Sequence, residues 1–292
     1  MNRLLFIILF VGTTCLTPAQ NIPFKMEELS ATEFIKAVDA SEQTCIIPIG
    51  VFEKHGAHLP LGTDLYIARE IAIRAAQKEY VVVFPEYYFS QVNEARHQPG
   101  TIAYSPELIW KILQETLDEL SRNGFKKIIL VNGHGGNNAF LDYFGMSQMS
   151  KPRDYALYWF RQTYSRDILN QVIELTQDDP DDGHGGNRET SMMLAVAPEL
   201  VQQHRAGEQS GKDQKRMTHL GNTYSGIWWY ARFPNHYAGD GSKASAEAGE
   251  LMLSHLVDQL IEAIKTVKSD ETVPELQNQY FRETQQPLKT IQ

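Results

Sequence analysis

The sequence has only two cysteines, Cys15 and Cys45, in 292 residues. This excludes a framework of disulfides as the main source of stability, and a chain of this length can bury a core large enough to fold without one. Cys45 lies inside the apolar run Thr44–Ile49. A thiol in such a run is typical of a packed core position rather than of a nucleophile.

The sequence also lacks a surplus of basic residues. It has 27 Lys and Arg against 36 Asp and Glu, a net charge of −9 and a pI near 5.5. Proteins that bind nucleic acids or anionic membranes generally present basic surfaces. We therefore expect neither a nucleic acid nor a membrane surface as a partner.

Long hydrophobic runs are scarce, and the most prominent one is at the N-terminus. Arg3 precedes the apolar stretch Leu4–Val11, and the small residues Thr17-Pro18-Ala19 follow. This order is typical of a secretory signal peptide, which we assign to residues 1–20, and the run is too short for an ordinary membrane span. The expected location is secreted or periplasmic. An uncleaved anchor, or a lipid attached at Cys15, stays open.

The remainder, residues 21–267, reads as one domain followed by a polar tail at 268–292. Apolar runs alternate with helical patterns through the first two-thirds, which favours a mainly parallel α/β sheet covered by helices on both faces. The predicted strands are 44–49, 81–84, 127–131 and 156–159. The predicted helices are 30–38, 65–78, 106–123, a segment from 138 and 244–267, whereas 198–242 reads as irregular.

Acidic and histidine side chains follow the first of these strands. Glu53 and His55 come soon after Gly50, and Asp64 follows a Pro/Gly loop. Residues two apart in an extended segment point to the same side, and loops at the carboxyl ends of buried strands commonly carry ligands. Alternatively, Asp64 could cap a helix, and the whole segment could be a polar surface loop.

Two further segments add comparable groups. His134 follows the third strand, and His184 and Glu189 precede a segment of helical character at 192–195, with glycines beside both histidines. Imidazoles and carboxylates together suit Zn²⁺ or Mn²⁺ better than Ca²⁺. Five or six such groups exceed the needs of one tetrahedral ion, which suggests two ions that share a carboxylate. Two metals can hold a hydroxide and polarise a carbonyl.

Other interpretations of these motifs remain. The glycine-rich turn after His134 could hold an anion on backbone N–H groups. His58, His97 and His236 stand alone in the sequence, which is more typical of surface or core histidines than of ligands. The pair Trp228-Trp229 favours packing or a subunit contact over a substrate gate.

Taken together, the motifs resemble those of the creatininase (creatinine amidohydrolase) family. They are Glu53–Gly56 with Leu59–Asp64, then Asn132–Asn137, then His184–Gly186 with Glu189–Ser191, and the similarity covers about residues 29–264. The resemblance implies a three-layer α/β/α sandwich, a binuclear Zn or Mn site, hydrolysis of a non-peptide C–N bond, and assembly into oligomers, hexamers among them.

The resemblance also implies roles for individual residues. Glu53, Asp64 and His134 would hold one metal, and His55 and Asp64 the second, with Asp64 bridging. Creatininase carries Tyr-Glu after the histidine of its second motif, where this chain has Gly135-Gly136. Glu189 would then replace that glutamate as a ligand of the second metal. A tryptophan found in creatininase is replaced here by Pro180, and both departures argue against creatinine as the substrate.

We therefore predict a metal-dependent amidohydrolase with two divalent ions, Zn and/or Mn, and a small-molecule amide or formamide substrate. His184 and Glu189 are assigned to catalysis, with His184 handling the proton passed to the leaving nitrogen. A homo-oligomer is expected. The alternatives are a deformylase or peptide-trimming hydrolase of the same family, and a metal-dependent binding protein without catalysis.

Overall fold

A computed structural model describes residues 22–177 and 182–289. The predicted signal peptide at 1–20 and Pro180 lie outside these residues. Within the described segments, no helix combines the length and the apolar character that a membrane span requires.

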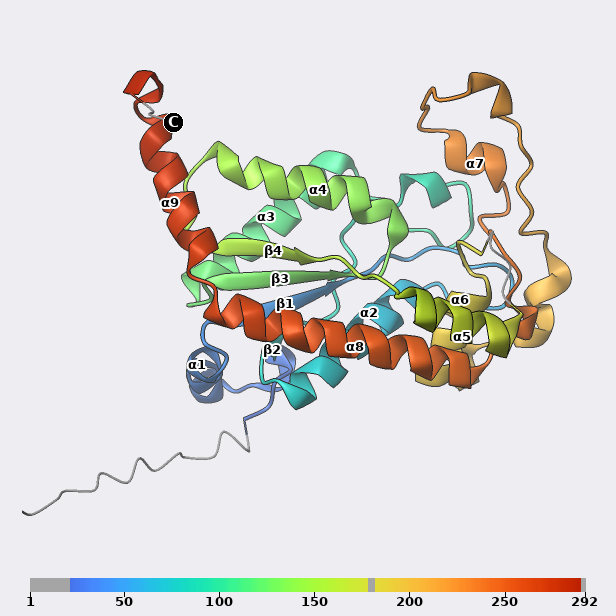
Figure 1. The fold of residues 1–292 in the computed structure, drawn as a ribbon, viewed down its shortest axis with the longest axis horizontal. Helices are drawn as coiled ribbons and strands as arrows, with labels where there is room; N and C mark the ends of the chain where they lie inside the picture. The colour runs from blue at the N-terminus through green and yellow to red at the C-terminus, as the bar shows by residue number, and fades with distance from the viewer. Residues whose placement is uncertain (1–21, 178–181, 290–292) are drawn as a thin grey trace, which may run out of the picture.

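A four-stranded, fully parallel sheet forms the centre of the fold, with strand order β2-β1-β3-β4 (Figure 1). The strands are β1 (Thr44–Ile49), β2 (Val82–Val83), β3 (Lys127–Asn132) and β4 (Ala156–Phe160). The strand predicted at 81–84 has only two ladder residues. Its neighbour Phe84 still donates its N–H to Ile46 O, and Pro85 then ends the segment because proline has no N–H to donate.

Helices cover both faces of this sheet, which makes the three-layer α/β/α sandwich that was expected. One layer contains α1 (Ala31–Ala40), α3 (Pro106–Arg122) and α4 (Asn138–Ser147), and the other contains α2 (Thr63–Lys78), α5 (Arg166–Thr176), α6 (Asn187–Val196) and α8 (Ala246–Ser269). Successive residues of a strand pack against opposite helix layers. Ile47 packs with the first layer and Ile46 with the second, as the period of a strand requires.

Capping residues fix where several helices begin. Ser30 and Glu33 form a reciprocal capping box on α1, and Ser105 caps α3 ahead of proline at its first position. Helix α5 was not predicted from the sequence. Its start carries the same signal, because the Ser165 hydroxyl accepts a hydrogen bond from the N–H of Ile168.

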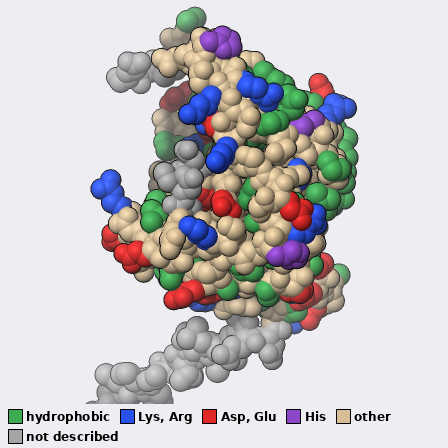
Figure 2. Space-filling model, turned by 90° about the vertical axis from the view of Figure 1, so that its right-hand side faces the viewer, with side chains coloured by type: hydrophobic (Ala, Val, Ile, Leu, Met, Phe, Trp, Pro, Cys, Tyr) green, Lys and Arg blue, Asp and Glu red, His purple; other side chains and the backbone are tan. Residues whose placement is uncertain are grey.

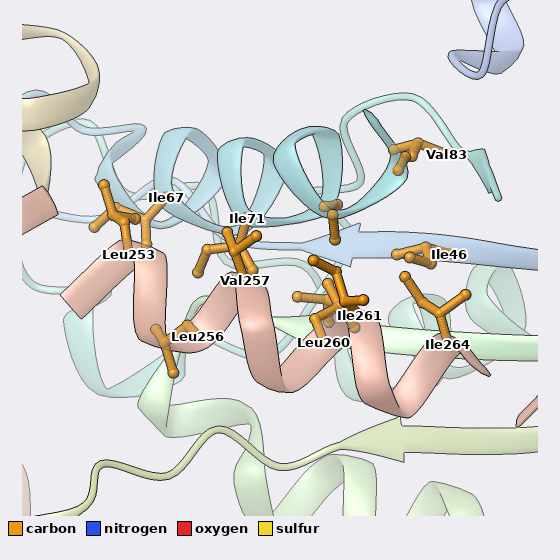
Figure 3. Close-up of a cluster of buried hydrophobic side chains, with 14 of the residues drawn as sticks. Ile46, Ile67, Ile71, Val83, Leu253, Leu256, Val257, Leu260, Ile261 and Ile264 are labelled. Atoms are coloured by element: carbon orange, nitrogen blue, oxygen red, sulfur yellow. The ribbon is translucent and has the colours of Figure 1, made fainter. Parts of the chain in front are cut away.

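Helix α8 supplies most of one core layer. Figure 3 shows its apolar side chains packed against α2, β1 and β2. The labelled residues are Leu253, Leu256, Val257, Leu260, Ile261 and Ile264 of α8, facing Ile67, Ile71, Ile46 and Val83. Burying one such side chain stabilises the fold by about 1.5–3 kcal/mol. The packing of α8 thus stabilises the sheet whose loops form the candidate site.

The segment predicted as a polar tail is structured. Helix α8 continues to Ser269, and α9 (Thr272–Thr284) follows and projects from one end of the molecule (Figure 1). No residue of α9 is buried. The hydroxyl of Tyr158 donates to Asp270, and the Gln277 amide donates to Tyr155 O. These polar contacts attach α9 to the domain. Hydrophobic periodicity alone could not predict this helix, because α9 presents no apolar face to the core.

The carboxyl ends of the strands point toward the opposite end of the molecule (Figure 1). The loops after β1 and β3 meet there with the long segment that carries the short helix α7 (Trp228–Arg232). This is the position at which parallel sheets generally bind ligands.

Candidate metal centre

Backbone geometry brings three distant segments to this end of the sheet. Glu53 and His55 lie on the loop after β1, His134 lies two residues after the end of β3, and Asp64 is the second residue of α2. Gly62 precedes α2 without a side-chain cap, so Asp64 does not act as the N-cap. A Cβ on Gly133 would overlap with the carbonyl oxygen of Asp64, so glycine is what lets this loop approach the helix.

Glu53, Asp64 and His134 form the first group of candidate ligands. The Nδ1 atom of His134 lies 2.7 Å from Glu53 Oε1 and 3.3 Å from Asp64 Oδ2. All three side chains are buried, and their ligand atoms lie within 4.8 Å of one another. The resemblance assigns these residues to one metal.

His55, Asp64 and Glu189 form the second group. His55 Nε2 lies 3.0 Å from Asp64 Oδ1 and 3.7 Å from Glu189 Oε2. The opposite ring nitrogen of His55 donates to the Glu53 carbonyl oxygen at 3.3 Å, which leaves Nε2 as the ligand atom. Asp64 belongs to both groups, with one carboxylate oxygen directed to each.

The buried oxygens fit a metal. Glu53 Oε1 and Asp64 Oδ2 are buried and have no hydrogen-bond partner, even though a histidine nitrogen lies near both. An unpaired buried carboxylate oxygen costs free energy that an ion would recover. These donors, imidazole nitrogen and carboxylate oxygen, are those that Zn²⁺ and Mn²⁺ accept.

The pKa shifts show the same excess of negative charge. Burial and nearby Asp64 and Glu53 raise the pKa of Glu189 to about 7, against the opposing charge of His55. Burial alone would lower the pKa of His55, but Asp64, Glu189 and Glu53 raise it to about 10. The imidazole of His55 therefore holds a proton where a bound cation would otherwise balance these carboxylates.

His184 lies beside both groups. Its Nε2 donates to the carbonyl oxygen of Lys54 at 2.9 Å, and its Nδ1 lies 3.8 Å from Glu189 Oε2. Burial and the charges of His55 and His236 lower its pKa well below the ordinary value, against the attraction of Glu53. His184 is therefore a neutral imidazole whose Nδ1 can accept a proton. It also lies close enough to Glu53 and His55 to form a third possible ligand group.

Sequence reasoning missed Glu94, which contacts the centre from the loop before α3. Its Oε1 lies 3.2 Å from His134 Nε2. The His134 ring therefore contacts the Glu94 carboxylate through Nε2 and faces the other members of the first ligand group through Nδ1. A Cβ on Gly136 would overlap with Glu94 Oε1 and His134 Nε2. The glycine at position 136 is the sequence feature that could have indicated that another side chain occupies the space next to His134.

Of the three isolated histidines, His236 is the one that contacts a candidate ligand. It is buried, with its Nε2 2.5 Å from Glu53 Oε2. His58 is a core histidine, bonded to Thr190 Oγ1 at 2.8 Å, and burial lowers its pKa to about 4. His97 is exposed and lies 2.9 Å from Pro234 O. The backbone and spacing around His236 resemble no ligand motif, so sequence alone gave no signal.

A cavity of about 1390 Å³ opens over the candidate metal centre. Glu53, His134, His184 and Glu189 lie at its base. Aromatic and apolar side chains of the α7 segment and α4 line its wall, namely Tyr224, Ile227, Trp228, Trp229, Tyr230 and Phe140. The tryptophan pair therefore lines the cavity, and Trp229 also packs against the rings of Phe233 and His236.

Comparisons with known proteins agree with this geometry. The family model described as creatinine amidohydrolase (Creatininase) matches residues 27–264. Creatinine amidohydrolase of Pseudomonas putida is 26% identical over 266 residues, covering 82% of this chain and 95% of that protein. A mycofactocin precursor peptide peptidase of Mycolicibacterium smegmatis is 30% identical over 165 residues, which cover 53% of this chain and 59% of the peptidase.

Solved structures agree on the fold. A crystal structure of creatinine amidohydrolase superposes with a TM-score of 0.71 at 23% identity, covering 85% of this chain and 98% of that one. A putative creatinine amidohydrolase of Bacteroides fragilis gives 0.68 at 24% identity, covering 86% and 99%. Other similar creatininases are described as a manganese form and a Zn–Zn form. The family model covers most of the chain, and the chain therefore belongs to the creatininase family.

Proposed function

We propose that this protein is a binuclear, metal-dependent amidohydrolase that cleaves a non-peptide C–N bond in a small-molecule amide. One observation carries the proposal. Asp64 directs Oδ1 toward His55 and Oδ2 toward His134, so that two ligand groups share one buried carboxylate. A single ion would need only one of these groups.

The proposed ligands follow from the two groups. Glu53, Asp64 and His134 would hold one ion, and His55, Asp64 and Glu189 the other, as Zn and/or Mn. Two such ions, when bound, activate a water molecule and polarise the amide oxygen. Membership in a family of hydrolases supports this assignment.

His184 supplies the proton transfer in this proposal. Its N–H at Nε2 is committed to Lys54 O, so Nδ1 keeps a free lone pair on the side of Glu189. Nδ1 takes a proton from the attacking water and passes it to the leaving nitrogen, which then departs as a neutral amine. The lowered pKa of His184 favours the neutral imidazole, whose Nδ1 lone pair is not already protonated.

The cavity supports a substrate larger than a single small ring. At about 1390 Å³ it exceeds the roughly 300–1,000 Å³ typical of small-molecule sites. Arg96 is the one lysine or arginine among its described lining residues, too few for a polyphosphate. Figure 2 shows acidic and basic side chains interspersed on the side of the molecule toward which the carboxyl ends of the strands point, and this mixture also favours an uncharged amide over a polyanion.

A peptide-trimming activity is the second candidate. The size of the cavity and the 30% identity to a relative named as a peptide peptidase favour it. A deformylase is the third candidate, since a relative named as a pyrimidine deformylase is 32% identical over 102 residues. A binding protein without catalysis would keep the metals and hydrolyse none of these substrates.

Metal content is the first test. Elemental analysis of the purified, metal-replete protein should give two ions per chain, and Glu189→Ala should give one. One ion or none in the wild type would refute the binuclear site. The protein is then assayed with cyclic amides, formamides and short peptides. Full turnover by a metal-loaded His184→Ala variant would remove the role given to His184.

Export and assembly are further parts of the proposal. We propose that residues 1–20 are removed on export to a secreted or periplasmic location, and that the mature chain forms a homo-oligomer, such as a hexamer, without nucleic-acid or membrane partners. N-terminal sequencing of the mature protein tests the cleavage. Light scattering of the eluted peak tests the oligomer.

A further inference from the structure

We propose that Trp229 and His236 are a positioning pair that orients Glu53 for the metal. The inference rests on the proposed function only in taking Glu53 to be a ligand. Neither residue belongs to the motifs that identify the family, and both come from the irregular segment at 198–242. The pair links the aromatic wall of the cavity to the base of the metal centre.

The first step is the hydrogen bond between the two side chains. The indole nitrogen Nε1 of Trp229 lies 2.8 Å from Nδ1 of His236. An indole N–H can only donate, so Nδ1 must be the accepting nitrogen of His236. The proton of the imidazole is therefore on Nε2, and Trp229 determines the tautomer.

The second step is the contact with Glu53. His236 Nε2 lies 2.5 Å from Glu53 Oε2, and with its proton there it donates to this carboxylate oxygen. The other oxygen, Oε1, has no hydrogen-bond partner and lies 2.7 Å from His134 Nδ1. The two oxygens are thus distinguished. One is held by His236, and the other is left for the ion.

The third step concerns the backbone of His236. Its φ is 51°, in the left-handed region that non-glycine residues rarely adopt. Its N–H donates to Phe233 O at 2.9 Å, and its ring packs at 4.6 Å from that of His184 and 5.8 Å from that of Trp229. The fold maintains an unfavourable backbone conformation at the point where the imidazole reaches Glu53, which is common at functional sites.

The neighbouring tryptophan offers a matched control. Trp228 lies on the same short helix, lines the same cavity and packs 5.4 Å from the Trp229 ring. Arg232 lies over its ring, and Trp229 is the residue of the two that donates to His236. Replacing either tryptophan by phenylalanine removes comparable bulk, but Trp229→Phe alone removes the N–H that sets the tautomer.

The test is the affinity for Zn²⁺, measured on the full chain by competition with a chromophoric chelator. Loss of a residue that orients a ligand typically weakens metal binding by about 10–100-fold. We expect a loss of this size for Trp229→Phe and a change of less than about twofold for Trp228→Phe. Equal affinities of the two variants would overturn the proposal.

A second pair of variants separates positioning from packing. Glutamine can place a donor near the position of Nε2, so His236→Gln should retain more zinc affinity than His236→Leu. A purely structural role would lower both equally, together with the midpoint of thermal unfolding of the metal-free protein.

Nitrogen NMR of the histidines gives a readout that needs no metal. The metal-free wild type should show His236 as the Nε2–H tautomer, and Trp229→Phe should lose this preference while Trp228→Phe keeps it. If the wild type bound no zinc but showed this pattern, the proposed metal function would fail and the pairing would stand. An Nδ1–H tautomer in the wild type would refute the pairing itself.

Discussion

Gly136 determines what surrounds His134, because its missing side chain leaves room for a carboxylate from another segment. Glu94 occupies that room and lies 3.2 Å from the outer ring nitrogen of His134. Gly135, one residue earlier, is open to space, with nothing within 4 Å of an added Cβ. The two glycines therefore have different consequences although they are adjacent.

A first prediction follows from this difference. Gly136→Ala should displace the Glu94 carboxylate and weaken zinc affinity by about 10–100-fold, because His134 loses the partner that orients it. The chelator competition described above measures this loss. Gly135→Ala is the control and should bind zinc as the wild type does. Wild-type affinity in both variants would contradict the role given to Glu94.

Cys45 gives a second prediction at the residue scale. Its side chain is fully buried in β1, and burial raises the pKa of its thiol, so the reactive thiolate does not form in the folded protein. In a Cys15→Ser chain, Ellman's reagent should label no thiol until denaturant is added. Rapid labelling of one thiol per folded chain would show that β1 is more accessible than the structure indicates.

The sequence indicated candidate ligands wherever glycine and strand patterns coincided. Glu53, His55, Asp64, His134 and Glu189 could be singled out because each follows a strand or opens a helix beside small residues. Glu94 and His236 could not. Both lie on loops whose sequences show no hydrophobic periodicity. Glu94 contacts a residue 40 positions away in the sequence, and His236 contacts one 183 positions away.

At the scale of elements, burial periodicity was sufficient for the helices that pack on the sheet. Helix α8 has an apolar stripe over most of its length, and its predicted span agrees with the observed one to within two residues at each end. Helix α9 has no such stripe, and α5 was overlooked although Ser165 caps it. Strand β2 is shorter than predicted because an apolar run does not determine how many residues pair.

Helix α9 provides a third prediction. A chain that ends at Glu271 keeps the Lys127–Glu271 contact at 3.1 Å and loses no buried side chain, so its free energy of unfolding should fall by about 1 kcal/mol or less. Urea unfolding measures this.

A chain that ends at Lys265 is the matched control. It also loses Val267 and Lys268, both 8% exposed, and with them the carbonyl that accepts from Lys127. It should be destabilised by about 2 kcal/mol or more. Equal losses in the two chains would indicate that α9 contributes to the core.

At the scale of the whole molecule, the candidate ligands come from elements on both faces of the sheet. Asp64 belongs to α2 and Glu189 to α6, both packed against α8, whereas His134 leads into α4 on the other face. An ion held by these residues binds the folded chain and not the unfolded one. Metal binding should therefore raise the stability of the entire domain.

A fourth prediction states the size of this effect. At a free metal concentration of about 100 times Kd, the stabilisation is about 2.7 kcal/mol, or about 5–10 °C in Tm. Calorimetry with and without a chelator measures the shift. Asp64→Asn, which removes the shared charge with little change of shape, should lose most of it. A chelator that leaves the wild-type Tm unchanged would argue against a bound metal.

The order of the ligands along the chain has a consequence for protein synthesis. The first ligand group is complete once His134 has been made, the second only at Glu189, and the positioning pair only at His236. A chain interrupted between these points would present a half-built centre, able to attract a metal without holding it in place. Full metal affinity therefore requires that synthesis has reached the last third of the chain and that all three layers have folded.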